Sequence, residues 1–560
     1  MCRIFVFIRF VSIFLLVFHF NPINSNASGS TDNNQTSKIN LDLKSSTATE
    51  VQISFKLNDF QIQEVVANGE QFQKFIIENE SSVSPEGWPD LPSIRRLVLI
   101  PPQSGVELKI TGLLTHIVGD INVFPRQISI ESDKNNTMNI DSDPDDLTLS
   151  AEAASCEGFW PREVASIGTP AIMRGYRMVS VVINPMRYNR QTRQLEVVDE
   201  IDIELDFGSE DNRVNPVERP RPNLHSQAVL DLVSDLVVNP PEPSRDMGIR
   251  NGSIVYVIKQ WDEVEDALRP LIEWRRQMGW SVEVIRVNDD AQNEEIKAAI
   301  QEAYDEWDTP PEMVVICGDT DGPYSIACWD HRRGANVAYE SDHDYVMLDG
   351  DDVLPDAAIG RFSFNGIAEG TRRLGDIVDK IISYESDPFI GEGDQVGWQK
   401  RAALFAGDQR SGFSCIDVCK WAKELMIRND YDEFYERYWS EDDPRPDGQN
   451  WITDVFNNGI SLYLYRGWAN MNNFAASDVL DLQNERMLPF VILPTCNTGD
   501  FAQDPFSYAE RFLQHSEGGG IGCVGMGGAS HTAYNNLLAA SVFRSIFGSK
   551  NPYQGWAAMA

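Results

Sequence analysis

The feature that most constrains this 560-residue chain is a regular alternation of apolar and amphipathic segments after Gly252. Segments at 293–307 and 371–384 have the spacing of amphipathic helices. Strands separated by helices predict a mostly parallel sheet with helices on both faces, an α/β fold whose functional loops follow the carboxyl ends of the strands. The apolar runs of strand type are Ser253–Lys259, Ser281–Val287, Glu312–Cys317, Ala357–Phe362, Arg401–Ala406, Ile460–Tyr465, Phe490–Pro494 and Gly520–Gly525.

The preceding part of the chain has a different pattern. Residues 51–207 contain mostly strand signals, and the run at 194–207 alternates apolar with acidic residues, as a half-buried strand does. Residues 28–50 are rich in Ser, Thr, Asn and Asp, which predicts disorder. Residues 208–252 contain Pro-rich, charged stretches and are predicted to be a linker. We therefore expect a mostly β domain at 51–207 and an α/β domain at 253–560.

The first 27 residues have the composition of a signal peptide. Arg3 and Arg9 are followed by the apolar run Val11–Phe18, and small residues, Ser25 and Ala27, precede the expected cleavage point. The apolar run is shorter than the roughly 20 residues that a membrane span requires. We expect a secreted or cell-surface protein with no membrane span in the mature chain.

The charge balance excludes some classes of partner. The chain has 47 basic and 85 acidic residues, a net charge of −38. Nucleic-acid binding requires a basic face, so no nucleic-acid partner is expected. Eight cysteines in 560 residues do not indicate a disulfide scaffold.

One cysteine stands where chemistry is expected. Cys496 directly follows a predicted buried strand, in the loop Thr495-Cys496-Asn497-Thr498-Gly499-Asp500-Phe501. A thiolate nucleophile needs partial exposure and nearby backbone N–H donors, which a strand-end loop offers. The alternative is a small buried apolar side chain, and position alone leaves both interpretations open.

These motifs resemble the gingipain family of cysteine peptidases, which have a caspase-like fold. The pattern at 495–501 is similar to the family's catalytic cysteine motif. The segment ending in Tyr465-Arg466-Gly467 is similar to the strand that precedes this motif in the family. The resemblance covers about residues 50–560 and implies a propeptide of mostly β structure. It also implies a cysteine endopeptidase made as a zymogen, with Cys496 as nucleophile, protein or peptide substrates and no cofactor required for catalysis. Further similar segments are Phe506–Glu510, Gly518–Gly525 and Asp342–Arg361.

The chain departs from the family pattern at one catalytic position. Where the family has a catalytic His-Gly, this sequence has Trp468-Ala469, and an indole cannot accept a proton. The chain is then an inactive relative, or Cys496 acts with another base, or the correspondence is shifted by one loop. The candidate replacement is His531, which follows the strand expected beside that of Cys496. His531 could instead be a loop histidine bonded to the backbone.

The resemblance implies roles for further residues. Asp342 matches an acidic residue that lines the pocket for a basic substrate side chain in arginine-specific members, and a carboxylate there favours Arg or Lys. Asp349, Asp351 and Asp352 surround a glycine and are candidates for a structural calcium site. Both groups could also be ordinary acidic loop residues. The backbone N–H groups of Cys496 and of Gly467 or Trp468 are expected to hold the oxyanion.

Three functions are therefore compared: a secreted cysteine endopeptidase, a catalytically impaired relative that binds peptides or partners, and an acidic calcium-dependent surface protein. We expect maturation to cut the linker at Arg213, Arg219 or Arg221. Residues 555–560 resemble the opening of a helix without a stop signal, so the natural protein is expected to continue beyond Ala560.

Overall fold

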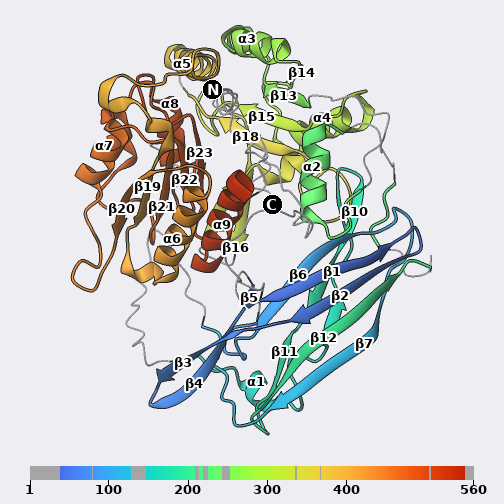
Figure 1. Ribbon diagram of the computed structural model, residues 1–560. Helices are drawn as coiled ribbons and strands as arrows, with labels where there is room; N and C mark the ends of the chain where they lie inside the picture. The colour runs from blue at the N-terminus through green and yellow to red at the C-terminus, as the bar shows by residue number, and fades with distance from the viewer. Residues whose placement is uncertain are drawn as a thin grey trace, which may run out of the picture.

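The structure is a computed structural model that describes residues 38–548, except 78–79, 83, 128–146, 209–213, 219–224, 242–251, 334–336, 366 and 503–505. Figure 1 shows a β-rich N-terminal domain below two α/β units that lie side by side. The predicted signal peptide, the predicted cleavage sites Arg213, Arg219 and Arg221, and the expected helix at 555–560 lie outside the described residues.

The N-terminal domain contains two antiparallel sheets whose inner faces share one apolar core, which includes Ile53, Phe55, Ile183 and Ile203. The first sheet consists of β1 (Ile39–Ser46), β2 (Glu50–Leu57), β12 (Gln194–Asp206), β11 (Met186–Asn189) and β7 (Glu107–Val118). The second consists of β5 (Ser81–Ser82), β6 (Pro92–Leu99), β10 (Tyr176–Ile183), β8 (Ala165–Ile167) and β9 (Ala171–Met173). A hairpin of β3 (Gln61–Ala67) and β4 (Glu70–Ile76) and a short helix, α1 (Ala151–Ser155), complete it.

The predicted disorder at 28–50 is wrong for the segment that forms β1. This strand pairs antiparallel with β2 along its whole length. Ile39 and Leu41 pack against the core of the domain, which is enough to hold an otherwise polar segment in the sheet. Composition misled the prediction because the backbone hydrogen bonds of an edge strand do not depend on side-chain type.

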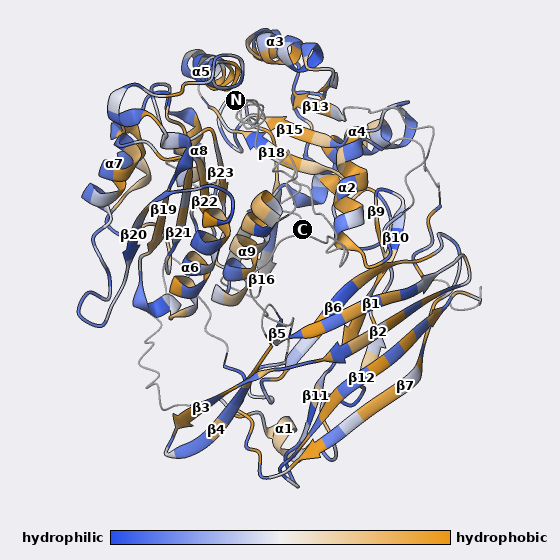
Figure 2. Ribbon diagram, viewed as in Figure 1, coloured by the Kyte–Doolittle hydropathy of each residue, from blue (hydrophilic) through white to orange (hydrophobic). Residues whose placement is uncertain are grey.

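The first α/β unit has a parallel sheet in the order β14-β13-β15-β18. Helices α3 (Asp262–Gln277) and α5 (Ile367–Ser386) pack on one face, and α4 (Asn293–Glu306) packs on the other. In Figure 2 these helices carry both apolar and polar residues, as expected for helices with one buried face. The strands are β13 (Ser253–Ile258), β14 (Ser281–Arg286), β15 (Met313–Cys317) and β18 (Ala358–Phe362), and a separate pair is β16 (Trp329–Arg333) with β17 (Val337–Ser341).

The second α/β unit has a parallel sheet in the order β20-β19-β21-β22-β23. Helices α6 (Ser414–Ile427) and α9 (Thr532–Gly548) cover one face, and α7 (Gln449–Asn457) and α8 (Tyr508–Gln514) cover the other. The predicted α/β class is thus confirmed, with the strands divided between two sheets instead of one. In the part of the chain that the structure describes, no helix is both long and apolar enough to cross a membrane. The strands are β20 (Glu433–Tyr438), β19 (Arg401–Ala406), β21 (Leu462–Arg466), β22 (Phe490–Leu493) and β23 (Gly522–Gly525).

The segment predicted as a linker contains a helix, α2 (Gln227–Leu236). Its apolar side chains at helical spacing, Val229, Leu232 and Val233, are buried in one core with β13 and α3 of the α/β unit and with Met178 of β10. The linker prediction is therefore wrong for this stretch. The Pro-rich flanks obscured a short amphipathic helix that fills a core shared by two domains.

The N-terminal domain is also fixed to the first α/β unit by polar contacts. The backbone N–H of Ile172 donates to Asp352 Oδ2 at 2.8 Å, and the backbone N–H of Arg174 donates to Asp356 Oδ1 at 2.6 Å. The buried Arg174 guanidinium donates to the carbonyl of Pro311 at 2.6 Å and to that of Asp356 at 2.5 Å. Burial, followed by the nearby charge of Asp349, raises the pKa of Asp356 to about 7.

Candidate active site

The candidate nucleophile lies in a tight turn at the carboxyl end of β22. The Thr498 hydroxyl donates to the carbonyl of Leu493 at 2.6 Å and so closes the turn around Cys496. Asn497 has a left-handed backbone with φ 62°, a conformation that Asn tolerates better than most residues. Its N–H donates to the carbonyl of Gly528 at 3.2 Å, which attaches the turn to the loop after β23. Cys496 itself is 0% exposed, so the partial exposure expected at this position is wrong for this structure, because the loops on both sides close over the sulfur.

The loop after β23 brings Ser530 against the sulfur. The Ser530 N–H donates to Cys496 Sγ at 3.1 Å, and the thiol can donate to the Ser530 carbonyl at 3.4 Å. This proximity follows from topology, because β22 and β23 pair in parallel and their carboxyl ends meet at one edge. A backbone N–H directed at sulfur stabilises a thiolate, as a charge-assisted hydrogen bond does.

The segment after β21 approaches Cys496 from the other side. Ala469 forms an isolated parallel bridge with Cys496, and the Asn470 N–H donates to the Cys496 carbonyl at 3.0 Å. Trp468 precedes this bridge, is 4% exposed and lies under the guanidinium of Arg410, which is 5.4 Å from the ring centroid. The indole is therefore a buried neighbour of the cysteine turn.

One of the predicted oxyanion donors, the Gly467 N–H, already has a hydrogen-bond acceptor within the protein. The Gly467 N–H donates to the hydroxyl of Thr495 at 3.0 Å. The same hydroxyl accepts from Arg466, so the contact belongs to a buried network beneath the site. For Gly467 to bind an oxyanion, it would have to leave Thr495.

His531 lies one residue beyond Ser530, with its ring held by the start of α9. Its Nδ1 accepts from the Ala533 N–H at 3.1 Å, so the neutral ring carries its proton on Nε2. That Nε2 is buried and has no hydrogen-bond partner among the described residues. Burial lowers the pKa of His531, and the positive charge of Arg126 lowers it further, while Glu86 opposes the shift. The last two residues belong to the N-terminal domain, which therefore reaches this part of the site.

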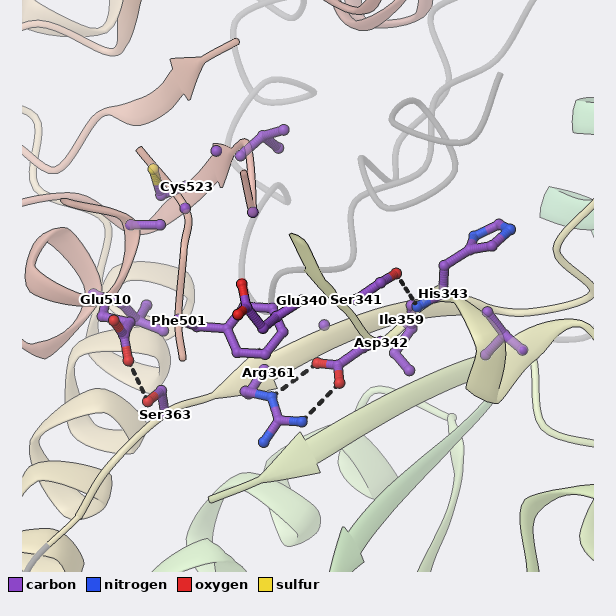
Figure 3. Close-up of a pocket in the computed structure, with 18 of the residues that line it drawn as sticks. Glu340, Ser341, Asp342, His343, Ile359, Arg361, Ser363, Phe501, Glu510 and Cys523 are labelled. Atoms are coloured by element: carbon purple, nitrogen blue, oxygen red, sulfur yellow. Dashed lines mark hydrogen bonds and ion pairs between the residues drawn. The ribbon is translucent and has the colours of Figure 1, made fainter. Parts of the chain in front are cut away.

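A cavity of about 370 Å³ lies next to the cysteine turn, between the edge strands β18 and β23 of the two sheets. Gly499 and Phe501 of the turn line it, together with Glu510 of α8. Figure 3 shows Glu510 bonded to Ser363, and burial raises the pKa of this carboxyl to about 7. The cavity is thus partly polar, and Cys496 itself is not among the residues that line it.

Asp342 lines this cavity, but its carboxylate is paired with a buried arginine. Arg361 donates to Asp342 Oδ2 at 2.8 Å through Nε and to Oδ1 at 2.7 Å through Nη2 (Figure 3). Arg361 also stacks on Phe501, with 4.9 Å between the guanidinium carbon and the ring centroid. A basic substrate side chain would therefore have to compete with Arg361, and the specificity role of Asp342 stays a prediction.

The three aspartates predicted for calcium lie at the boundary with the N-terminal domain, away from the cysteine turn. The oxygens of Asp352 accept N–H groups from Ile172 and Leu354 at 2.8 Å, and Asp349 accepts the Tyr304 hydroxyl at 2.7 Å. The Asp351 backbone N–H donates to Asn215 at 3.1 Å. Within the described ranges, no group of three or more His, Cys, Asp or Glu side chains is placed to hold one metal ion. In this arrangement the residues do not fit a calcium site, and calcium binding stays a prediction.

The sequence motifs pointed to Cys496, Trp468 and His531 but not to Ser530, which contacts Cys496, or to Arg466, which bonds residues next to Cys496 and His531. Ser530 was not singled out because it contributes its backbone. Arg466 was quoted only as part of a motif, although a charged residue ending the apolar strand Tyr463-Leu464-Tyr465 signals a buried cation that needs several acceptors.

Comparison with known proteins assigns the class that the fold and the cysteine turn define. The chain belongs to peptidase family C25: the family model matches residues 250–560, and the family's propeptide model matches residues 33–231. The resemblance inferred from the sequence motifs is thus confirmed.

The individual relatives are distant. Gingipain R2 of Porphyromonas gingivalis is 24% identical over 489 residues, which cover 83% of this chain and 61% of that protein. Lys-gingipain HG66 of the same organism is 23% identical, over 93% of this chain and 30% of its own length. The chain thus spans less than two thirds of these relatives. The solved structure of the Arg-specific cysteine proteinase gingipain R aligns at a TM-score of 0.46 with 22% identity, covering 55% of this chain and 72% of that one, too weak a likeness to add to the assignment.

Proposed function

We propose that this protein is a secreted cysteine endopeptidase, made as a zymogen, that hydrolyses peptide bonds through the thiolate of Cys496. The observation that carries the proposal is the tight strand-end turn of Cys496, with the Ser530 N–H 3.1 Å from its sulfur. The thiolate attacks the scissile carbonyl, the amine leaves with a proton, and water hydrolyses the resulting acyl-enzyme. The signal peptide predicted from residues 1–27 supports export.

The proton transfers are assigned to His531. Its lowered pKa keeps the ring neutral near pH 7, which suits a base. Accepting the thiol proton at Nδ1 requires the Ala533 contact to break, and the resulting imidazolium then protonates the leaving amine. The oxyanion is assigned to the N–H groups of Cys496 and of Gly467 or Trp468. The Trp468 indole forms a wall of the cleft.

The N-terminal domain serves as the propeptide in this proposal. Its residues Arg126 and Glu86 lie close enough to His531 to affect the pKa of the histidine. Removing the domain would take both charges away from the surroundings of His531. Protein or peptide substrates with a basic residue before the cut follow from the proposed role of Asp342.

The second candidate is a catalytically impaired relative that binds peptides or partners. Trp468 occupies the position at which the family has its catalytic histidine, and its indole is packed under Arg410. The His531 Nδ1 lone pair is used by Ala533. Both observations favour a site that retains the shape of a cleft without a poised base.

Two measurements distinguish the active peptidase from the impaired relative. They are the peptidase activity and the thiol labelling of the secreted chain, before and after removal of the N-terminal domain. Cys496→Ala should abolish peptidase activity and labelling by an active-site-directed thiol probe, whereas Cys419→Ala, which removes a buried thiol from α6, should retain both. His531→Ala should lower activity by roughly 10²–10⁴-fold, the usual contribution of a general acid–base group. Full activity in Cys496→Ala would refute the peptidase proposal. A wild-type chain inert to peptides and thiol probes would favour the impaired relative.

A further inference from the structure

Arg466 is a buried cation whose position the catalytic roles above do not explain. It is the last residue of β21, is 0% exposed and is among the largest fully buried side chains of the described part of the chain. A guanidinium at such a position is costly unless its donors find partners. Its donors are directed at the loops that surround Cys496.

The first of these loops is the cysteine turn itself. Arg466 Nη1 donates to the carbonyl of Pro494 and, at 3.2 Å, to the hydroxyl of Thr495. These two residues immediately precede Cys496. The Thr495 hydroxyl also accepts the Gly467 N–H at 3.0 Å, so the guanidinium, the turn and the Trp468 segment share one hydrogen-bond network.

The second loop is the one that carries Ser530 and His531. Arg466 Nε donates to Asn536 Oδ1 at 2.8 Å, and Nη2 lies 3.5 Å from the Thr532 carbonyl. Both partners are in the first turns of α9, directly after His531. The planar fork of an arginine suits such a role because it presents several donors in fixed directions. One side chain therefore connects the end of β21, the cysteine turn and the start of α9.

We propose that Arg466 is a positioning residue of the reaction centre, holding the Ser530 N–H against the Cys496 sulfur while its positive charge favours the thiolate. The proposal rests on Cys496 being the nucleophile of the proposed function. The oxygen partners named above are neutral acceptors. Nη2 also lies 3.3 Å from Cys415 Sγ, so the guanidinium contacts a second thiol as well as the residues that precede Cys496. A cation near a thiol in a site excluded from water favours the deprotonated form.

The test is a pH titration of the full chain that follows thiolate absorbance near 240 nm. Subtracting the titration of the same chain with Cys496→Ala isolates the Cys496 signal and requires neither substrate nor probe access. This reference is made in each Arg466 background, because Cys415 Sγ lies 3.3 Å from Arg466 Nη2 and its own titration will also change. Arg466→Gln should raise the titration midpoint by about one to two pH units, the usual effect of losing a close opposite charge. Arg466→Lys keeps the charge but loses the fork that holds the loop of Ser530, so its midpoint should still rise, by at least about 0.3 pH units but by less than half as much as in Arg466→Gln.

Arg401→Gln is the matched control. Arg401 begins β19, the neighbouring strand, and its guanidinium donates to the carbonyls of Asn458, Asp394 and Val396 at the opposite end of the sheet. This change should lower stability without moving the Cys496 midpoint.

A purely structural role for Arg466 would lower the unfolding temperature and leave the midpoint unchanged, and that result would overturn the proposal. If Arg466→Gln fails to fold, a midpoint in Arg466→Lys that is equal to wild type, together with unchanged thiol reactivity at Cys496, would also overturn it. A shifted midpoint in a chain without peptidase activity would support Arg466 as a positioning residue while refuting the peptidase proposal. The two proposals therefore fail separately.

Discussion

Arg174 offers a direct test of how the N-terminal domain is held. Its guanidinium donates to the carbonyls of Pro311 and Asp356 and lies 5.5 Å from the ring centroid of Tyr304. Arg174→Ala removes both side-chain bonds and leaves two buried carbonyls without these donors. Hydrogen bonds from charged groups contribute about 1.5–3 kcal/mol each. Because the substitution also removes the cost of burying a charge, we take the lower end, about 3 kcal/mol in total.

Native-state hydrogen exchange of the full chain measures this loss at the interface. A loss of about 3 kcal/mol corresponds to roughly a hundredfold faster exchange, since about 1.4 kcal/mol is a factor of ten. The effect should be confined to peptides that contain β9, β10 and β18. Arg193→Ala is the control, because Arg193 has the same left-handed backbone, φ 53° against 50° for Arg174, but an exposed side chain. Acceleration below tenfold, or an equal effect in the control, would refute the reasoning.

Three further predictions follow from buried groups. Lys380→Met should lower the free energy of unfolding by about 1–3 kcal/mol in urea titrations at pH 6, because the buried amino group donates to carbonyls at the end of α8, including that of Leu513 at 2.7 Å. Burial lowers the pKa of Lys380 to about 7, so the group is mostly charged at that pH. A loss below about 1 kcal/mol would contradict this. The pKa of Asp356 is raised to about 7, so its contribution to stability is full below pH 4 and is lost as the pH rises through 7. The unfolding temperature of wild type minus that of Asp356→Asn should therefore fall between pH 4 and pH 7. A difference that does not change with pH would disprove the raised pKa. Trp468→His places an imidazole where the resemblance to the family implies a base, and peptidase assays should show at least tenfold higher activity. Unchanged activity would show that a base at this position is not what limits the reaction.

The buried strands of the α/β part were predictable because strands covered on both faces are continuous apolar runs. The predicted Arg401–Ala406 coincides with β19, and the run at 253–259 differs from β13 by one residue. The edge strand β20 was not predictable in this way, whereas the edge strands β14, β18 and β23 correspond to predicted runs. β20 reads Glu-Phe-Tyr-Glu-Arg-Tyr, a mixed sequence that becomes a strand only through pairing with β19.

The sequence was sufficient to predict which loops form the site, but not which side chains contact one another in it. Parallel pairing placed Cys496 and His531 at one edge of the sheet, because that depends only on strand order. The contacts of individual side chains depend on how separate loops close on one another. Arg466 finds acceptors in two loops that lie 28 and 66 residues further along the chain, and no local pattern encodes those distances.

Helix α2 has a practical consequence for anyone who wishes to produce the α/β part alone. The family boundaries suggest starting at residue 250, yet Val229, Leu232 and Val233 of α2 fill a core together with β13 and α3. The helix is further tied to the α/β unit by the Ser226 N–H, which donates to the buried Glu312 carboxylate at 2.8 Å. A recombinant fragment that begins after this helix would expose the apolar surface that α2 covers. It would also leave the Glu312 carboxylate without the Ser226 N–H, and it should aggregate. One that begins at or before His225 should remain in solution.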